Sequence, residues 1–279
     1  MLFSVRLLLL ILLCCGTKIT FAQNSPDLPR VMAFFSAKHD HAHISFVAEA
    51  NRWFDSLDRA GIISYDSVKD WSYLTETSTR NVNLLVFLDS RPPAGPARSA
   101  FEKYMREGGG WIGFHFSAFA LTPSDYPHDW PWYHDEFLGS GEYGSNTWRP
   151  TAAVLRIENK MHPITRGLPA TFVSAPNEWY RWSKDLRLNP EIDILVAIDS
   201  SSFPLGTGPK PHEIWHEGYY PVAWSNRKYK MAYFNMGHND IDYETGSLRT
   251  LSQTFGNPFQ DKLILNAILT LTKINAAIR

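Results

Sequence analysis

Short apolar segments alternate with amphipathic helical segments over residues 30–116, and this alternation limits the fold more than any other feature of the chain. Strands that alternate with helices form βαβ units, whose right-handed crossovers build a parallel sheet. We therefore predict an α/β fold. The expected strands lie at residues 30–35, 84–88 and 111–116, with a weaker candidate at 62–65, and the expected helices lie at residues 45–60 and 96–107.

The second half of the chain is less regular. Residues 126–135 are aromatic and interrupted by prolines, which predicts a long, ordered surface loop. A final helix is expected after Asn257, which can serve as its N-cap, with Pro258 at the first helical position. We find no internal repeat and no linker after Pro29, so we expect a single domain. Further strands are predicted at residues 152–157, 192–198, 221–225 and 231–235.

Composition and charge exclude some classes of protein. The chain has 279 residues, of which 44% are hydrophobic, and this is enough to bury a large core. Its formal net charge is -1, so it lacks the concentrated positive charge with which proteins bind nucleic acids. We expect no nucleic-acid partner, and the sequence leaves a homo-oligomer open.

Residues 1–22 have the pattern of a secretory signal peptide. Arg6 precedes a run of apolar residues, and small residues at alternate positions precede Gln23, as signal peptidase requires. The apolar run is shorter than the ~20 residues that span a bilayer, so no stable transmembrane anchor is expected. Lipid attachment at Cys15 is the weaker alternative, because Leu13 and Cys14 stand where small residues are expected. We predict export to the periplasm or the medium.

Both cysteines of the chain, Cys14 and Cys15, lie inside this segment. The mature protein would therefore have no disulfide bond, no zinc–thiolate cluster and no cysteine nucleophile. Catalysis by a cysteine nucleophile and metal binding by thiolates are therefore not expected.

The segment from Gly108 to His115 places a histidine at the end of a buried strand. Three glycines end the preceding helix, and a nearly continuous apolar run from Trp111 follows them. Open α/β sheets bind ligands at the carboxyl ends of their strands, which is where His115 falls. A histidine that is hydrogen-bonded within the core is the alternative interpretation.

Two other segments bring histidines to strand ends. His39, His41 and His43 follow the first strand as a polar loop, which is either a chelating site for a divalent metal ion or a solvated loop. His238 and Asn239 follow the strand predicted at residues 231–235. If that strand is parallel to the others, His43, His115 and His238 share one edge of the sheet.

A third segment contains a carboxylate among aromatic residues. Glu178 lies beside Trp179 and Tyr180, where it either acts as a general acid or base with a pKa raised by desolvation or caps a turn. The chain has 10 tryptophans and 12 tyrosines, many in loops, and such flat apolar faces rimmed by polar groups suit a sugar ring. We expect Tyr133 and Trp224 to serve with Trp179 as walls or supports of the site.

The chain resembles the trehalose-utilisation family, the ThuA-like proteins, over residues 30–273. The resemblance rests on ordered motifs: His43-Ile44-Ser45, Gly108 to His115, Tyr133 with Gly139, His162 to Pro169, Asn177 to Tyr180, Pro221 to Trp224, and Gly237-His238. It implies a three-layer fold similar to flavodoxin and the class I glutamine amidotransferases, with a mainly parallel sheet, helices on both faces and long aromatic loops. This chain departs from the family at Asn177, where aspartate is usual. His115 stands near the position of the amidotransferase cysteine, which excludes glutamine hydrolysis through a thioester.

The resemblance also implies a carbohydrate ligand, with a 3-keto glycoside as the candidate substrate. It makes His115, Glu178 and His43 the catalytic candidates and Tyr133, Trp179, Tyr180, Trp224, His238 and Asn239 the substrate-binding candidates. A lyase or hydrolase acting on keto-glycosides is the leading hypothesis, with a divalent metal at His43, His115 and His238 left open. The alternatives are a sugar-binding or accessory protein without turnover, and a structural module of an envelope complex. Convergence of the three histidines on a cavity would favour the first two hypotheses over the third.

Overall fold

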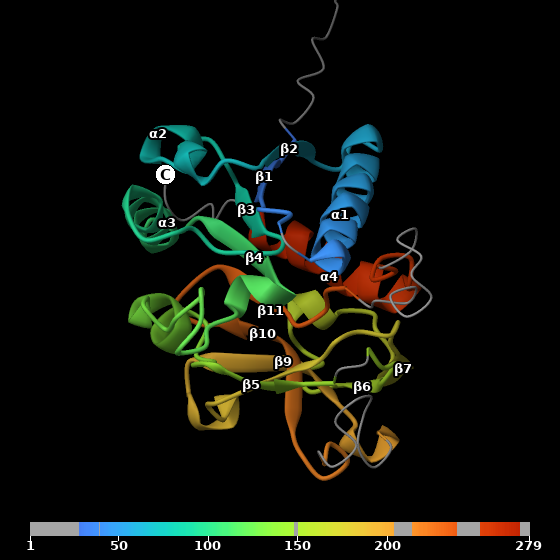
Figure 1. Cartoon of the computed structure of the whole chain (residues 1–279). Coiled ribbons are helices and arrows are strands. Elements are labelled where there is room, and N and C mark those ends of the chain that lie inside the picture. The colour runs from blue at the N-terminus through green and yellow to red at the C-terminus, as the bar shows by residue number, and fades with distance from the viewer. Residues whose placement is uncertain (1–27, 39, 148–149, 204–213, 239–251, 274–279) are drawn as a thin grey trace, which may run out of the picture.

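The computed structural model describes residues 28–38, 40–147, 150–203, 214–238 and 252–273 (Figure 1). The predicted signal peptide, both cysteines, His39 and Asn239 lie outside the described residues. No helix of the described part of the chain is long and apolar enough to cross a membrane.

A nine-stranded sheet forms the middle of the molecule, in the strand order β2-β1-β3-β4-β11-β10-β9-β6-β7. The first five strands in this order pair in parallel, and the remaining pairs are antiparallel. The parallel part has the flavodoxin-like order 2-1-3-4-5. The bounds are β1 (Arg30–Phe34), β2 (Ser64–Val68), β3 (Leu84–Phe87), β4 (Gly110–Phe114), β6 (Val154–Ile157), β7 (Thr171–Val173), β9 (Ile192–Ile198), β10 (Tyr220–Asn226) and β11 (Met231–Phe234).

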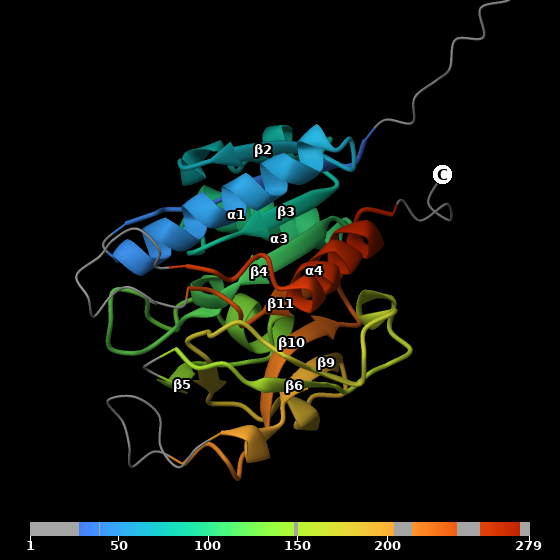
Figure 2. The same ribbon diagram turned by 90° about the vertical axis from the view of Figure 1, so that its right-hand side faces the viewer.

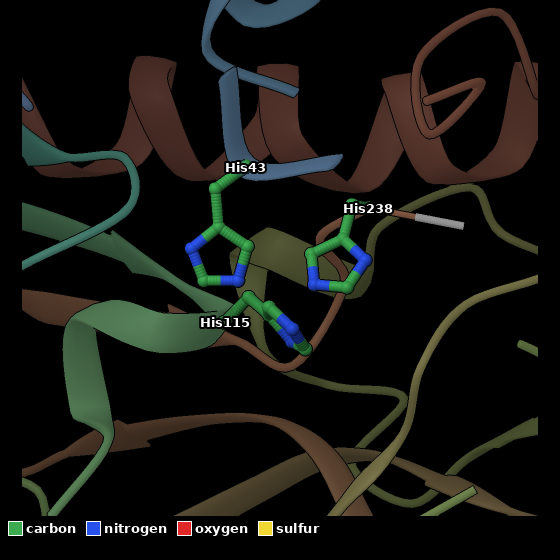
Figure 3. A group of neighbouring side chains, drawn as sticks. All are labelled: His43, His115 and His238. Carbon is green, nitrogen blue, oxygen red and sulfur yellow. The ribbon is translucent and has the colours of Figure 1, made fainter. Parts of the chain in front are cut away.

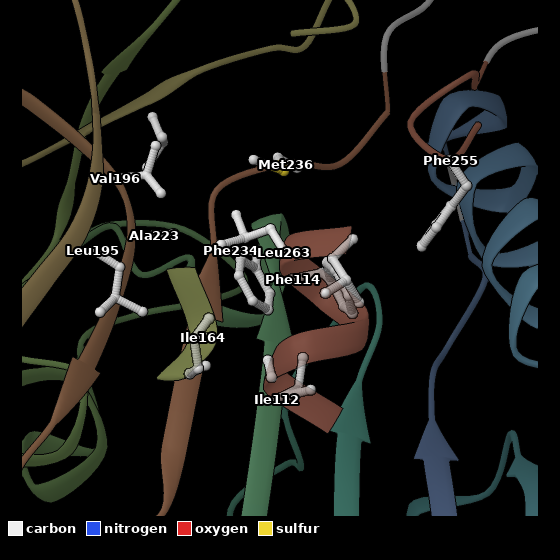
Figure 4. Packing of buried hydrophobic residues seen from close by; sticks show 14 of the residues in the cluster. Ile112, Phe114, Ile164, Leu195, Val196, Ala223, Phe234, Met236, Phe255 and Leu263 are labelled. Carbon is white, nitrogen blue, oxygen red and sulfur yellow. The ribbon is translucent and has the colours of Figure 1, made fainter. Parts of the chain in front are cut away.

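Helices cover both faces of the parallel part (Figures 1 and 2). Helices α1 (His41–Arg59) and α4 (Pro258–Leu271) pack on one face, and α3 (Pro96–Arg106) packs on the other, with short α2 (Glu76–Thr79) beside it. Side chains of successive strand residues point to opposite faces. Ile112 and Phe114 of β4 therefore join the core under α1 and α4 (Figure 4). Trp111 joins the core under α3. The predicted α/β fold with three layers is confirmed.

Smaller elements complete the described part of the chain. Strand β5 (Tyr143–Asn146) pairs with β8 (Tyr180–Trp182) in a separate two-stranded sheet. Single helical turns are η1 (Trp71–Tyr73), η2 (His115–Ala118), η3 (Trp132–Phe137), η4 (Pro163–Thr165), η5 (Leu186–Leu188) and η6 (Ser200–Ser202).

The structure corrects two expectations about secondary structure. Helix α1 begins at His41, inside the expected polar loop, because the Asp40 side chain accepts a hydrogen bond from the backbone N–H of Ala42 and caps the helix. The expected surface loop at residues 126–135 is wrong in part, because Trp130, Tyr133 and His134 are buried. The rings of Trp130 and Tyr133 bury more apolar surface by packing beneath α3 than they could in a solvated loop.

The burial of His134 predicts a pH-dependent stability. Burial, and secondly the nearby charge of Arg91, lower the pKa of this imidazole to about 2. Below about pH 6.5 the unfolded chain takes up a proton that the folded chain does not, so the free energy of unfolding falls by roughly 1.4 kcal/mol per pH unit. His134→Gln should remove that part of the slope between about pH 7 and pH 5, as measured by urea unfolding. His41→Gln, which changes an exposed histidine, is the control, and an unchanged slope in His134→Gln would contradict the prediction.

Candidate active site

The carboxyl edge of the parallel strands gathers residues that are far apart in the sequence. Asp89 lies two residues after β3, His115 directly follows β4, and His238 follows β11. His43 lies in the first turn of α1, the helix that follows β1. Strands β1 and β3 are neighbours whose crossover helices α1 and α3 cover opposite faces, and ligands bind at such switch points in open α/β sheets.

His115 occupies a strained turn between β4 and the single helical turn η2. Its φ is 41°, in the left-handed region, which costs a residue with a side chain of order 1–3 kcal/mol and is found most often at functional sites. The Tyr233 hydroxyl donates to the His115 carbonyl oxygen at 2.7 Å. The imidazole stacks on Tyr180 with ring centroids 4.0 Å apart. The backbone and the ring are therefore both held in place.

Gly237 permits the close approach of the His115 ring. A Cβ atom at position 237 would lie 2.3 Å from Cγ of His115, well inside van der Waals contact. The backbone N–H of Gly237 donates to Oδ1 of Asn177 at 3.1 Å. Because residue 237 is a glycine, the ring of His115 can lie against the backbone next to His238. Asn177, which replaces the usual aspartate, still offers an acceptor oxygen to the Gly237 N–H.

Glu178 connects two of the histidines. Its Oε2 atom lies 3.4 Å from Nε2 of His115 and 3.2 Å from Nε2 of His238, and its Oε1 atom accepts a hydrogen bond from the Asn146 amide. The backbone N–H of Glu178 also donates to the carbonyl oxygen of His238 at 3.3 Å. The side chain is almost wholly buried, with 7% of the residue surface exposed. The loop that carries Glu178 is therefore clamped onto the loop that follows β11.

The expected raised pKa of Glu178 is wrong. Burial alone would raise it, but hydrogen bonds and charge interactions with His115 and His238 outweigh burial, and the net pKa is well below the ordinary value. Burial lowers the pKa of His115 and of His43, and the charge of His238 lowers the pKa of His43 further. At neutral pH, Glu178 is therefore a carboxylate and both of these histidines are neutral bases.

The three histidines face one another across a small space (Figure 3). One nitrogen from each of His43, His115 and His238 lies within 4.8 Å of the other two. The ring centroids of His43 and His238 are 4.7 Å apart, and those of His115 and His238 are 4.8 Å apart. The alternating chelate of His39, His41 and His43 does not form among the described residues, because His41 is exposed and residues two apart do not share a helix face.

A cavity of about 490 Å³ opens in front of this cluster. Its lining combines the aromatic rings of Phe116, Tyr126 and Tyr180 with two imidazoles and several carboxylates. His115 lies just behind the lining, with 2% of its surface exposed. Asp89 is oriented by the backbone N–H groups of Ser36 and Ala37, at 2.7 and 2.6 Å. The lining residues are Ser36, Lys38, Asp40, His43, Asp89, Phe116, Asp125, Tyr126, Glu178, Tyr180 and His238.

Three of the expected substrate-binding residues do not line the cavity. Tyr133, Trp179 and Trp224 are completely buried, and each donates a hydrogen bond to a backbone carbonyl oxygen, of Ser117, Thr151 and Leu138 respectively. Their large rings form the core behind the site because burying that area is more favourable than exposing it. They are supports rather than walls.

Sequence reasoning missed several residues of the lining. Asp89 follows the strand predicted at residues 84–88, so the argument that identified His115 would have found it. Phe116, Asp125 and Tyr126 lie in the loop after β4 and carry no comparable signal in the sequence.

A larger groove, of about 800 Å³, lies at the opposite end of the sheet, around the end of α3 and the start of β4. It is lined by Lys103, Arg106, Arg227, Lys228 and other residues, none of them a histidine. We assign the site to the smaller cavity because it contains the buried imidazoles and carboxylate.

These features define an α/β protein with a cavity lined by imidazole and carboxylate groups at the switch point of a flavodoxin-like sheet. Residues 30–254 match the ThuA family, described as trehalose utilisation, and the chain belongs to this family. The recognition made from the sequence motifs is confirmed.

Two solved structures have similar folds. A ThuA-like protein from Bacteroides uniformis ATCC 8492 is 29% identical, with a TM-score of 0.78, over 94% of this chain and 98% of its own. A ThuA-like protein from Parabacteroides merdae ATCC 43184 is 19% identical, with a TM-score of 0.60, over 89% of this chain and 94% of its own. Comparison with curated proteins gave no match.

Proposed function

We propose that this ThuA protein is exported, binds a 3-keto glycoside, and cleaves or rearranges it by acid–base chemistry. The observation that carries the proposal is the convergence of His43, His238 and Glu178 on one cavity, with His115 packed directly behind them. General acid–base catalysis needs titratable groups within hydrogen-bond reach of the substrate, and this cavity supplies them.

The lining suits a sugar. Tyr126, Tyr180 and Phe116 present flat apolar faces, and Asp89 and Asp125 present acceptors for hydroxyl groups. The volume of about 490 Å³ lies within the range of small-molecule sites. The description of the family as trehalose utilisation supports a disaccharide-like ligand.

The cluster also suits chemistry next to a ketone. In a 3-keto glycoside, the C3 carbonyl acidifies the proton on C2. A neutral imidazole that takes this proton leaves its electron pair to form a C1–C2 double bond as the C1–O bond breaks, and the departing glycosidic oxygen takes a proton. His43 lines the cavity and is the least buried of the three imidazoles, so we assign it as the base. His115 and Glu178 position His238 and the cavity wall.

The test compares a 3-keto disaccharide with the same disaccharide before oxidation, each incubated with the mature protein in deuterated water. We expect products from the oxidised sugar alone, and deuterium at C2 of recovered substrate if proton removal is reversible. The readouts are mass spectrometry and NMR. Absence of both product and deuterium exchange would overturn the proposed chemistry.

The second candidate is a sugar-binding protein without turnover. It is favoured by His115, which stands near the place of the amidotransferase cysteine and is too buried to attack a ligand directly. This candidate predicts that a sugar raises the melting temperature while no product forms, because a ligand stabilises the native state whether or not it reacts. A purely structural module is less favoured, since the histidines converge on a cavity instead of being scattered.

A further inference from the structure

We propose that His115, His238 and Glu178 hold one divalent transition-metal ion of the zinc class, with His43 beside it. The proposal deepens the proposed function, since it rests on the same site, but it concerns binding of the ion and can be tested without any sugar. Imidazoles are common ligands for such ions, and one nitrogen from each of His43, His115 and His238 already lies within 4.8 Å of the other two.

The hydrogen bond of His115 determines which of its nitrogens can bind an ion. Nδ1 lies 3.2 Å from the carbonyl oxygen of Asn235, which can only accept, so Nδ1 carries the proton. In the neutral ring, Nε2 then presents a lone pair. Imidazoles that bind metals typically donate their other N–H to a carbonyl or carboxylate in this way, which fixes the ring and its tautomer.

Nε2 of His115 faces a buried carboxylate oxygen. Both groups are buried, and Oε2 of Glu178 lies 3.4 Å in front of Nε2. Buried carboxylates are found paired with a positive charge or bound to a metal ion. No lysine or arginine of the described chain forms an ion pair with Glu178. A cation bound by Nε2 and Oε2 would supply this charge.

The spacing fits such an ion. Two ligands that are each 2.0–2.1 Å from a tetrahedral zinc ion are about 3.3 Å apart. Oε2 of Glu178 lies 3.4 Å from Nε2 of His115 and 3.2 Å from Nε2 of His238, so both of these pairs already have that separation. Catalytic zinc sites have three protein ligands and an open position. Glu178 and His238 line the cavity, so the open position would face the ketone of the proposed substrate, and His43 would stay free to act as the base.

The experiment titrates chelator-treated, folded mature protein with Zn²⁺ by isothermal titration calorimetry, with Mg²⁺ as the oxygen-preferring comparison. We expect one Zn²⁺ per chain and no comparable heat with Mg²⁺. His115→Gln and His238→Gln should each weaken zinc binding by at least ~10-fold, since loss of even an outer-sphere partner has an effect of this size. His41→Gln, an exposed histidine two residues before His43, is the matched control and should bind as the wild type does.

Circular dichroism establishes whether each variant is folded, and Co²⁺ replaces Zn²⁺ as a second probe because its visible spectrum reports imidazole ligands. Folded wild-type protein that binds neither ion, or binding that is unchanged in the triple variant His43→Gln/His115→Gln/His238→Gln, would overturn the inference. Protein that binds zinc but turns over no oxidised sugar would contradict the proposed function alone. Protein that binds no zinc and turns over the sugar equally well with a chelator would contradict the metal site alone.

Discussion

Replacing His115 by glutamine is expected to lower turnover of a 3-keto glycoside by at least ~100-fold, because displacement of catalytic groups by about 1 Å has an effect of this order. The imidazole contacts Glu178, stacks on Tyr180 and lies against Gly237. Glutamine cannot reproduce the stacked ring, so Glu178 and His238 would lose the surface that fixes them. Initial rates on the oxidised disaccharide measure the effect.

The control for this prediction separates a role in turnover from a role in folding. His162→Gln changes another histidine, which caps the η4 turn and lies outside the cavity lining, and it should leave the rate unchanged. Melting temperatures of both variants show whether the fold persists. Equal turnover by wild type and a folded His115→Gln protein would remove His115 from the mechanism.

Replacing Trp179 by alanine is expected to reduce the free energy of unfolding by about 3–5 kcal/mol, the usual cost of truncating a buried aromatic side chain. The indole is completely buried, and its Nε1 atom donates to the carbonyl oxygen of Thr151 at 2.7 Å. The substitution would leave a cavity in the core and a carbonyl group without its donor. Urea unfolding at neutral pH measures the change.

This result would also distinguish a supporting role from a substrate-binding one. Trp179→Phe keeps most of the ring and should be less destabilising, with little change in sugar affinity for the folded protein. Met161→Ala, at a side chain that is 91% exposed, should change stability by less than ~0.5 kcal/mol. A Trp179→Ala protein of wild-type stability that has lost sugar binding would show instead that the indole contacts the ligand.

Part of the site was predictable from the chain because it follows from strand periodicity. Strand β4 (Gly110–Phe114) ends directly before His115, and strand β11 (Met231–Phe234) ends four residues before His238. Parallel strands place such residues on one edge whatever the details of packing. The same argument applies to Asp89, whose position could have been predicted and was not.

Other features depend on contacts that leave no local pattern. The partners of Glu178 come from the turn after β4, from β5 and from the loop after β11, and they reverse the expected direction of its pKa shift. The antiparallel half of the sheet includes β7, a strand of only three residues, which is too short to show periodicity. The aromatic segment around Tyr133 is buried because of what packs on it, which hydropathy along the chain does not report.

The amino-acid sequence by itself determined the alternating elements, the α/β class, the family and the strand ends that carry His115 and His238, because apolar periodicity and glycine turns act over a few residues. Only the tertiary structure decided which acceptor faces the imidazole of His115, which aromatic rings line the cavity and which lie behind it, and which way the Glu178 carboxyl titrates. Those outcomes depend on distances of a few ångströms between segments up to 120 residues apart. Burial and electrostatic interaction at such distances arise only when the chain has folded.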